Sequence, residues 1–548
     1  MSETGAQLVR YALEQLNTKH IFTVLGNHNR EIYDELNRST SISIHLLNQE
    51  ISAAFMADAI SRSAAEIEVG TVLITADAII SQGIADAFIS GIPLLIIAGG
   101  PAANDSTDGI DPMQLLQPVT KASFKVSEFN NIVSSIFEAQ LIAISDKPGP
   151  VFIEIPINLQ VHEDELEAPL PIHLSAANQS QIDQEQLEIS AQKLLAAENP
   201  VLFLGWGAAR HQQQIMALAD FLAAPVCTSL QGNSAFPAEH PLHGGLIANP
   251  SARHALKDCD CLISIGVNNN DLKYAELPKQ VVQLEAGAIP ALLHRLQSND
   301  NSGIDLKAPS TAKKIIQQIA KDKAELQENW LEHNSRGRVN PAVFFTALAK
   351  VLNNDAVVVT GYGSHRALAA ELLPINNDQD FISPSSFNAM GYCVPAVNAI
   401  KLANPEKQIV GIVGDGAMII SGMEVITAVR EKLGTVYCVF NNSERTADKN
   451  LGHINWGSFA DALECGYFPI ANNHDIDTIM RRALETSAQG QPVIVEITID
   501  YSRKTHYAQR VEKAQQASLP NRDKLGLVKR AIVRKIMGVA TAKNKGFQ

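Results

Sequence analysis

The stretch IVGDGAMIISGMEVITAVREKLGTVYCVFNNSE, residues 412–444, carries the clearest pattern in the chain. An apolar run over 409–413 ends in Gly414-Asp415-Gly416, and a second apolar run ends in Asn441-Asn442. Between the two runs we expect a helix from about Ile419 to Lys432. A strand, a loop, a helix and a second strand in this order are typical of a parallel α/β sheet, which binds its ligands at the carboxyl ends of the strands.

These two loops contain the residue types of a diphosphate and metal site. Glycines let backbone N–H groups approach phosphate oxygens, and Mg²⁺ prefers oxygen ligands while keeping coordination sites open for phosphate. Asp415 offers a carboxylate, Asn442 an amide oxygen 27 residues later, and Glu444 a backbone carbonyl as a third metal ligand. Gly-Asp-Gly alone more often marks an ordinary tight turn, and it is the paired amides at this spacing that favour a binding site.

The alternation of strands and helices extends over the rest of the chain. β-Branched runs alternate with Ala- and Leu-rich stretches, which predicts an α/β fold with three Rossmann-like domains and parallel sheets. The polar text after Pro156 indicates a linker, and a charged amphipathic helix over 316–334 indicates a second connector. The first and third blocks match in strand order and length, as divergent copies would. The expected parts are an N-terminal domain over 1–165, a central domain over 182–330, a C-terminal domain over 338–505 and a basic tail over 506–548.

The Gly-Asp-Gly and Asn-Asn pair at this spacing resembles the signature of thiamine-diphosphate-dependent enzymes. Further text is similar to the acetolactate synthase-like branch of that family, in the same order: IPLLIIAGG at 92–100, KPGPVFIEIP at 147–156 and MGYCVPAVNAIKLANP at 390–405. The resemblance implies a pyrimidine-binding N-terminal domain, a central domain and a diphosphate-binding C-terminal domain. It also implies thiamine diphosphate and Mg²⁺ as cofactors, and a homodimer or homotetramer in which neighbouring subunits share active sites.

The resemblance assigns the catalytic acid to Glu50, in the segment HLLNQEISAAFMADAISRS over 45–63. In the family this glutamate begins a helix after the second strand of the first domain and exchanges a proton with the pyrimidine ring of a cofactor held by a neighbouring subunit. A lone glutamate at a helix start is more often a partner of the helix dipole or a surface charge. The apolar strand before Glu50 and the Ala-rich helix after it favour the catalytic role.

Further cofactor contacts follow from the resemblance in the third block. Met390 matches the bulky residue that bends the cofactor, and Asn388 stands where a backbone carbonyl faces the cofactor's amino group. An isolated methionine is more often core filler. Ser364 and His365 lie in a loop that touches the diphosphate, although an ordinary strand-end loop is an equal alternative. The complete expected cofactor-binding set is Glu50, Ser364, His365, Asn388, Met390, Gly414, Asp415, Gly416, Ala417 and Asn442.

Two loops of the first block differ from those of acetolactate synthases. Residues 75–80 read TADAII where many relatives have a glycine-rich loop, and Asp77 adds a carboxylate there. Gly26-Asn27-His28-Asn29-Arg30 replaces a Pro/Gly-rich turn. His28 is a second catalytic candidate because histidine titrates near neutrality, with a solvated loop histidine as the equal alternative.

The sequence therefore predicts a lyase or transferase that acts on a small-molecule 2-oxo acid. It would be a decarboxylase, or a carboligase that adds a cofactor-bound enamine to an aldehyde or ketone acceptor. Acetolactate synthase proper, or a cofactor-binding homologue that is inactive or regulatory, are the alternatives. A nicotinamide-dependent dehydrogenase is disfavoured because no GxGxxG opens a helix after a strand. After Asn442 the basic residues Arg445, Lys449 and His453 fit an anionic substrate group, but a solvated polar loop is the more common explanation.

The central block lies where several relatives bind FAD or a nucleotide. Gly205-Trp206-Gly207 and the segment 266–271 stand at the matching strand ends. The arginine and the paired aspartates typical of the FAD loop in acetolactate synthases are absent after Gly266. We therefore expect no FAD.

Composition excludes several other classes. A net charge of −14, a pI near 5.6 and only 5% aromatic residues argue against a nucleic-acid binder. Six scattered cysteines, no signal peptide and no apolar run of about 18 residues favour the cytoplasm. The tail is rich in Lys and Arg, with Leu525, Val528 and Ile532 on one helical face. A membrane-surface helix or a lid is possible there, and docking on the acidic body or disorder is the favoured prediction.

Overall fold

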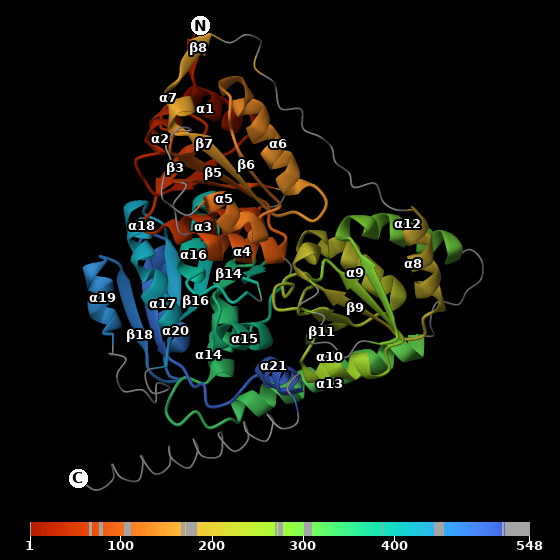
Figure 1. Cartoon of the computed structure of the whole chain (residues 1–548). Helices are drawn as coiled ribbons and strands as arrows, with labels where there is room; N and C mark the ends of the chain where they lie inside the picture. Colours follow the sequence, from red (N-terminus) through yellow and green to blue (C-terminus); the bar gives the residue numbers. More distant parts are fainter. Residues whose placement is uncertain are drawn as a thin grey trace.

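The computed structural model describes residues 2–64, 68–75, 80–102, 111–165, 170, 184–268, 271, 278–300, 309–376, 378–385, 387–442, 454–517 and 520. Within these ranges the chain forms three domains, each built on its own parallel sheet, as the alternating pattern predicts (Figure 1). The N-terminal domain lies on the C-terminal domain, and the central domain lies beside both.

The N-terminal sheet has six parallel strands in the order β3-β2-β4-β5-β7-β6. Successive side chains along each strand point to opposite faces of the sheet, and both faces are apolar. Helices α1 and α6 cover one face, and α3 and α4 cover the other. The strands are β2 (His20–Thr23), β3 (Ser43–Leu46), β4 (Gly70–Thr75), β5 (Leu94–Gly100), β6 (Ala122–Lys125) and β7 (Pro150–Pro156). The helices are α1 (Gly5–Gln15), α2 (Arg30–Leu36), α3 (Glu50–Ser63), α4 (Ser81–Ser90), α5 (Pro112–Leu116), α6 (Ile132–Ile144) and α7 (Ile157–Val161).

The C-terminal sheet repeats the same pattern in the order β15-β14-β16-β17-β19-β18. The first and third blocks thus share their strand order, as expected from the sequence. The strands are β14 (Val357–Thr360), β15 (Asp380–Ile382), β16 (Ile409–Gly414), β17 (Thr435–Asn441), β18 (Gly466–Ile470) and β19 (Val493–Thr498). The helices include α14 (Pro341–Val351), α15 (Ser364–Leu372), α16 (Cys393–Ala403), α17 (Asp415–Ser421), α18 (Val425–Arg430), α19 (Trp456–Ala462), α20 (Ile476–Ser487) and α21 (His506–Ala517).

The central sheet has five parallel strands in the order β11-β10-β9-β12-β13. Its strands are β9 (Pro200–Leu204), β10 (Val226–Thr228), β11 (His243–Leu246), β12 (Cys261–Ile265) and β13 (Gln280–Leu284). The helices around it are α8 (Gln184–Ala196), α9 (Gln212–Leu222), α10 (Pro250–Lys257), α12 (Ile289–Asp300) and the long connector α13 (Pro309–Leu331).

Helix α3 joins the N-terminal and C-terminal domains. It packs along α16, and the two helices share one continuous apolar cluster with strands of both sheets. Phe55 and Tyr392 meet edge to face in this cluster, with ring centroids 5.5 Å apart. Full burial of an aromatic or aliphatic side chain contributes about 1.5–3 kcal/mol, so this shared core holds the two domains in a fixed relation.

Three local predictions need correction. The helix expected over 419–432 begins earlier, at Asp415, and the 3₁₀ helix η5 (Gly422–Glu424) interrupts it, because glycine weakens a helix interior. The connector expected over 316–334 is α13, whose start at Pro309 suits the fixed φ of proline. The alternation of apolar runs does not indicate strands β6 and β11, because both are short and the two glycines of β11 hide its strand pattern.

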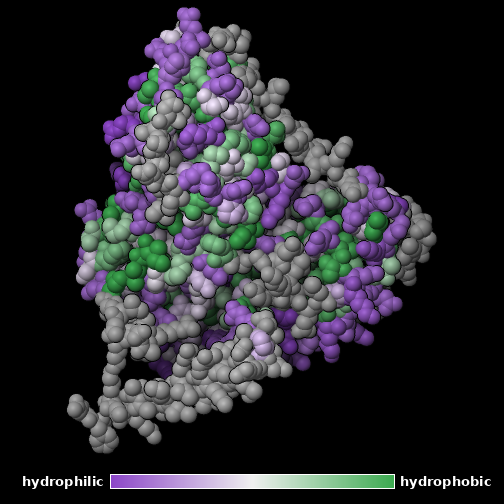
Figure 2. Space-filling model, in the orientation of Figure 1, coloured by the Kyte–Doolittle hydropathy of each residue, from purple (hydrophilic) through white to green (hydrophobic). Residues whose placement is uncertain are grey.

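The surface carries few hydrophobic patches in the view of Figure 2, and one lies over the C-terminal domain on the side of α18. Exposed apolar residues of that region include Ile419, Ile420 and Met423. In the part of the chain that the structure describes, no helix has the length and apolar character to cross a membrane.

The beginning of the basic tail is a docked helix. Helix α21 packs against α15, and the Thr505 hydroxyl accepts from the Ala508 N–H to cap it. His506 binds Glu371 of α15 through its backbone N–H at 2.8 Å. The apolar face predicted for 525–539 lies outside the described residues.

Candidate functional site

The carboxyl ends of three neighbouring strands bring the predicted loops to one edge of the C-terminal sheet. Strand β16 lies between β14 and β17, in parallel register with both. The turn after β14 therefore stands beside Gly414-Asp415-Gly416, and the end of β17 brings Asn442 to the same edge. This is the edge at which open α/β sheets bind ligands.

Asp415 and Asn442 are in direct contact. One carboxylate oxygen of Asp415 accepts from the Gly416 N–H at 2.8 Å, and the other accepts from the Asn442 N–H at 3.0 Å. Both residues are half-buried, so part of each remains accessible to a ligand. The predicted third metal ligand, Glu444, lies outside the described residues, as do Arg445, Lys449 and His453.

His365 forms the floor beside these loops. Its ring lies so close to two glycines that a Cβ on Gly414 would be 2.9 Å from Nδ1, and one on Gly363 would be 2.5 Å from the ring. Burial, with Arg366 nearby, lowers the pKa of His365 to about 3, so the free ring is neutral. Its Nε2 atom is buried without a hydrogen-bond partner.

An orphaned buried nitrogen is costly unless a further group completes it. A diphosphate oxygen beside Nε2 would accept a hydrogen bond, and its negative charge would favour the ring form that carries a proton on Nε2. The first-turn N–H groups of α15, which begins at Ser364, add further donors for an anion. The residues present therefore fit a diphosphate with a divalent cation at Asp415.

The segment 387–392 adds Asn388 and Met390 to the same region. A Cβ on Gly416 would lie 3.8 Å from Cε of Met390, so this methionine is a direct neighbour of the Gly-Asp-Gly loop. Asn388 has φ +67° and Gly391 φ +92°, both in the left-handed region. Met390 is 37% exposed. This exposure is unusual for a methionine that only packs in the core, and it suits a side chain that contacts a bound ligand.

Glu50 is the first residue of α3, as predicted. Within one chain, the residues just before it contact η5. The backbone N–H groups of Asn48 and Gln49 both donate to Glu424 of η5 at 3.1 Å. Glu424 lies at the end of η5, beyond α17, whose first residue is Asp415. Within one chain the start of α3 thus lies beside η5. The assignment of Glu50 to a neighbouring subunit's cofactor stays a prediction.

His28 lies in an ordered turn after β2. The buried Asn29 accepts from the Gly26 N–H at 2.9 Å and donates to the Val24 carbonyl at 3.0 Å. Gln160 donates to the carbonyl of His28 at 2.8 Å. Asn29 and Gln160 are therefore the residues that shape this loop. The sequence does not indicate their role, because it depends on the burial of Asn29. Residues 76–79, including Asp77, lie outside the described residues.

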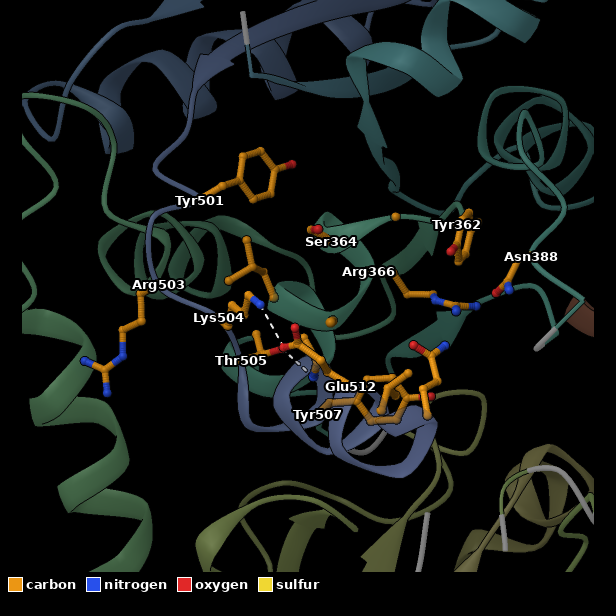
Figure 3. A pocket seen from close by; sticks show the side chains of 16 residues that line it. Tyr362, Ser364, Arg366, Asn388, Tyr501, Arg503, Lys504, Thr505, Tyr507 and Glu512 are labelled. Carbon is orange, nitrogen blue, oxygen red and sulfur yellow. Dashed lines mark hydrogen bonds and ion pairs between the residues drawn. The ribbon is translucent and has the colours of Figure 1, made fainter. Parts of the chain in front are cut away.

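A cavity of about 610 Å³ opens between the turn after β14, Asn388 and α21 (Figure 3). Gly363, Ser364 and Asn388 line one side, and the segment after β19 with α21 forms the other. Three tyrosines, Tyr362, Tyr501 and Tyr507, line it together with Arg366 and the Lys504–Glu512 ion pair at 2.7 Å. The sequence reasoning missed this wall, although Tyr501 follows the carboxyl end of β19 at the same sheet edge.

Comparison with known proteins identifies the family. Three thiamine pyrophosphate enzyme models match: the N-terminal TPP binding domain at residues 3–122, the central domain at 187–327 and the C-terminal TPP binding domain at 361–497. Thiamine pyrophosphate is the same molecule as thiamine diphosphate.

Relatives with similar sequences extend over nearly the whole chain. The probable acetolactate synthase large subunit of Methanocaldococcus jannaschii is 25% identical, covering 90% of this chain and 92% of its own length. The acetolactate synthase isozyme 3 large subunit of Escherichia coli is 26% identical, covering 92% and 96%. The acetolactate synthase large subunit of Haemophilus influenzae is 27% identical, covering 80% and 82%. Because three domain models match in order on three parallel-sheet domains, the chain belongs to the thiamine-diphosphate-dependent enzymes and is similar to the acetolactate synthase large subunits among them.

Proposed function

We propose that this chain is a thiamine-diphosphate- and Mg²⁺-dependent enzyme that decarboxylates a 2-oxo acid and either releases the product or joins it to an aldehyde or ketone acceptor. The observation that carries the proposal is the Asp415–Asn442 contact beside the buried ring of His365, whose Nδ1 lies against Gly414 and whose Nε2 has no hydrogen-bond partner. The similarity to acetolactate synthase large subunits favours the carboligase outcome.

When bound, thiamine diphosphate would supply a nucleophilic carbon and an electron sink for the decarboxylation of a 2-oxo acid. The chain's own residues hold it in place. Asp415, the amide oxygen of Asn442 and the carbonyl of Glu444 would hold Mg²⁺, while His365 and Ser364 would bind the diphosphate. Gly414, Gly416 and Ala417 let the backbone approach the phosphates.

The remaining predicted residues act on the organic part of the cofactor and on the substrate. Met390 would support the bent shape of the cofactor, and the carbonyl of Asn388 would accept from its amino group. Glu50 would exchange a proton with the pyrimidine ring, and His28 would donate a proton to, or orient, the reacting oxygen. The cavity beside Ser364, lined by Tyr362, Tyr501 and Arg366, offers a path for substrate. In this proposal the enzyme is a cytoplasmic homodimer or homotetramer without FAD.

Cofactor binding gives the first test. Adding thiamine diphosphate with Mg²⁺ is expected to raise the melting temperature by several degrees, because a ligand that binds only the folded state stabilises it in proportion to ln(1 + [L]/Kd). The measurement is a thermal melt of the full chain with cofactor and metal, with each alone, and with NAD. A shift with NAD alone, and none with thiamine diphosphate and Mg²⁺, would contradict the proposal.

Product analysis separates the remaining outcomes. A panel of 2-oxo acids, each with and without an aldehyde or ketone acceptor, is assayed for CO₂ and for new carbon–carbon bonds. Ligation of two pyruvate molecules would identify acetolactate synthase proper, and CO₂ with a free aldehyde would identify a decarboxylase. An inactive or regulatory homologue would bind the cofactor and yield neither product from any member of the panel.

His365 gives a second prediction. Replacing His365 with Phe keeps a planar ring against Gly414 and removes the nitrogen that faces the diphosphate. Cofactor affinity is expected to fall about tenfold, the effect of losing one hydrogen bond to a charged group. Isothermal titration calorimetry measures this Kd. His365→Gln, whose amide nitrogen has a similar reach, should recover part of the affinity; equal affinities of His365→Phe and the parent protein would remove His365 from the site.

A further inference from the structure

A cluster of buried charges lies where α3 and α4 meet the C-terminal domain. Arg62 has a fully buried side chain and binds Asp58 on the preceding helical turn at 2.5 Å and Asp86 of α4 at 3.4 Å. The guanidinium lies 5.4 Å from the ring centroid of Trp206 in the central domain. The ring of Tyr392 in the C-terminal domain lies 6.0 Å from the same guanidinium, so side chains from all three domains surround one arginine, together with a carbonyl of the C-terminal domain.

That carbonyl and the other partners belong to the segment 383–392. Asp86 accepts from the Ser385 N–H at 3.0 Å and from its hydroxyl at 2.7 Å, and Asp58 accepts from the Tyr392 hydroxyl at 2.8 Å. Arg62 donates to the Ser383 carbonyl at 3.4 Å. We call Asp58, Arg62, Asp86, Ser385 and Tyr392 the Arg62 cluster.

The middle of this segment lies next to the loop Gly414-Asp415-Gly416. Between the two anchors at Ser385 and Tyr392, Asn388 adopts a left-handed φ of +67° without being glycine, and Met390 is exposed next to Gly416. Asparagine tolerates the left-handed region better than most other non-glycine residues, so Asn388 suits a tight turn between the two anchored ends. Phe387, Asn388 and Met390 are exposed, while Ala389 between them is buried in the cluster shared by α3 and α16. The contacts at the two ends of the segment, together with the burial of Ala389, therefore hold its shape.

The type of interaction at the anchors is informative. Two carboxylates share one guanidinium, and burial raises the pKa of Asp86 despite the opposing effect of Arg62. Buried ion pairs of this kind add little net stability compared with apolar packing, but their directional hydrogen bonds specify one geometry. The surrounding α3–α16 contact is already well packed, so stability alone does not require charges here.

We propose that the Arg62 cluster is a positioning device: through Ser385 and Tyr392, the N-terminal domain sets the conformation in which the same chain's Asn388 and Met390 meet the bound cofactor. This inference rests on the proposed function. Asp58, Arg62 and Asp86 touch neither cofactor nor substrate and act through the 383–392 segment, whereas Glu50 at the start of the same helix is assigned to the chemistry itself.

Two mild variants and two matched controls test the inference. Ser385→Ala removes a hydroxyl that donates to Asp86 and accepts from the Phe387 N–H within the segment. Tyr392→Phe removes only the hydroxyl that donates to Asp58, so it tests the contact between the two domains alone. The controls lose similar buried hydroxyls that do not bond to the 383–392 segment, although Ser61 is next to Arg62 in the chain. Ser61→Ala removes the bond to the Pro93 carbonyl, and Tyr437→Phe removes the bond to Asn398. None of the four introduces a charge or a larger side chain.

The full chain is titrated with thiamine diphosphate at saturating Mg²⁺, and both the Kd and the near-ultraviolet circular dichroism of the bound aminopyrimidine are recorded with the melting temperature. We expect Ser385→Ala and Tyr392→Phe to weaken binding about tenfold and to change the dichroism band, the effect of one lost hydrogen bond on a preorganised contact. Ser61→Ala and Tyr437→Phe should lower the melting temperature by a similar amount and leave Kd and the band as in the parent protein.

If all four variants lose stability alike while Kd and the band stay unchanged, the cluster is only structural and the inference is overturned. If Ser385→Ala and Tyr392→Phe behave like the parent in every measurement, it is overturned as well. Failure of the proposed function has a separate signature, because then the parent protein itself shows neither binding nor a band.

Discussion

Asp415→Asn is expected to weaken the binding of Mg²⁺ and thiamine diphosphate by about a hundredfold or more and to reduce turnover to background. The carboxylate does two things in the structure: it accepts from the N–H groups of Gly416 and Asn442, and it offers the negative charge that a divalent cation requires. An amide keeps the volume but loses the charge, and its NH₂ group must face an N–H donor. Loss of a supporting group beside a metal already costs 10- to 100-fold, about 1.4 kcal/mol for each factor of ten, and loss of a ligand costs more.

The measurement is calorimetric titration of the cofactor at several Mg²⁺ concentrations, with CO₂ release measured in parallel. Asp461→Asn on α19 is the matched control, because the same chemical change occurs at an exposed site. Identical Mg²⁺ dependence for Asp415→Asn and the parent protein would show that the metal is held elsewhere.

Glu50→Gln is expected to lower kcat about a hundredfold to ten-thousandfold. The Kd for the cofactor should change only slightly. Glutamine has the shape of glutamate and can still donate or accept a hydrogen bond, but it cannot pass a proton to the pyrimidine ring. Positioned proton transfer contributes a factor of that size to catalysis. The change therefore separates cofactor binding from chemistry.

The two quantities to compare are kcat for CO₂ release or ligation and the Kd from calorimetry. Glu31→Gln is a matched control, since Glu31 also lies in the first turn of a helix, α2, and is exposed. Turnover of Glu50→Gln at the level of the parent protein would refute the assignment of Glu50, and a large loss of cofactor affinity would make its role one of binding.

The sequence could predict the contact between Asp415 and Asn442 because both residues end neighbouring strands. A parallel sheet brings such ends to one edge, whatever surrounds the sheet. The start of α3 at Glu50 was predictable for a similar reason, since an apolar strand and an Ala-rich run bracket it. The strand order shared by the first and third sheets follows from the same alternation of patterns.

Contacts that depend on how domains pack were beyond the sequence. The bond between Asp86 and Ser385 joins residues 299 positions apart in two domains, and nothing local to either residue indicates it. Arg62 looks like a helical surface charge until the packing buries it. The wall that α21 contributes to the cavity depends on where the chain returns after β19, which periodicity alone does not define.

The fit of the His365 ring against Gly363 and Gly414 bears on how such an enzyme diversifies. A methyl group at Gly414 would meet the ring at 2.9 Å, so even alanine there requires the ring or the strand end to move. Single substitutions at Gly363, Gly414 or His365 are therefore expected to disturb the contact with the cofactor. Tyr362 and Tyr501 stand on open walls of the cavity, where side chains can be exchanged one at a time. Changes in substrate specificity are accordingly expected to come from substitutions in the walls of the cavity. The residues of the floor should stay the same.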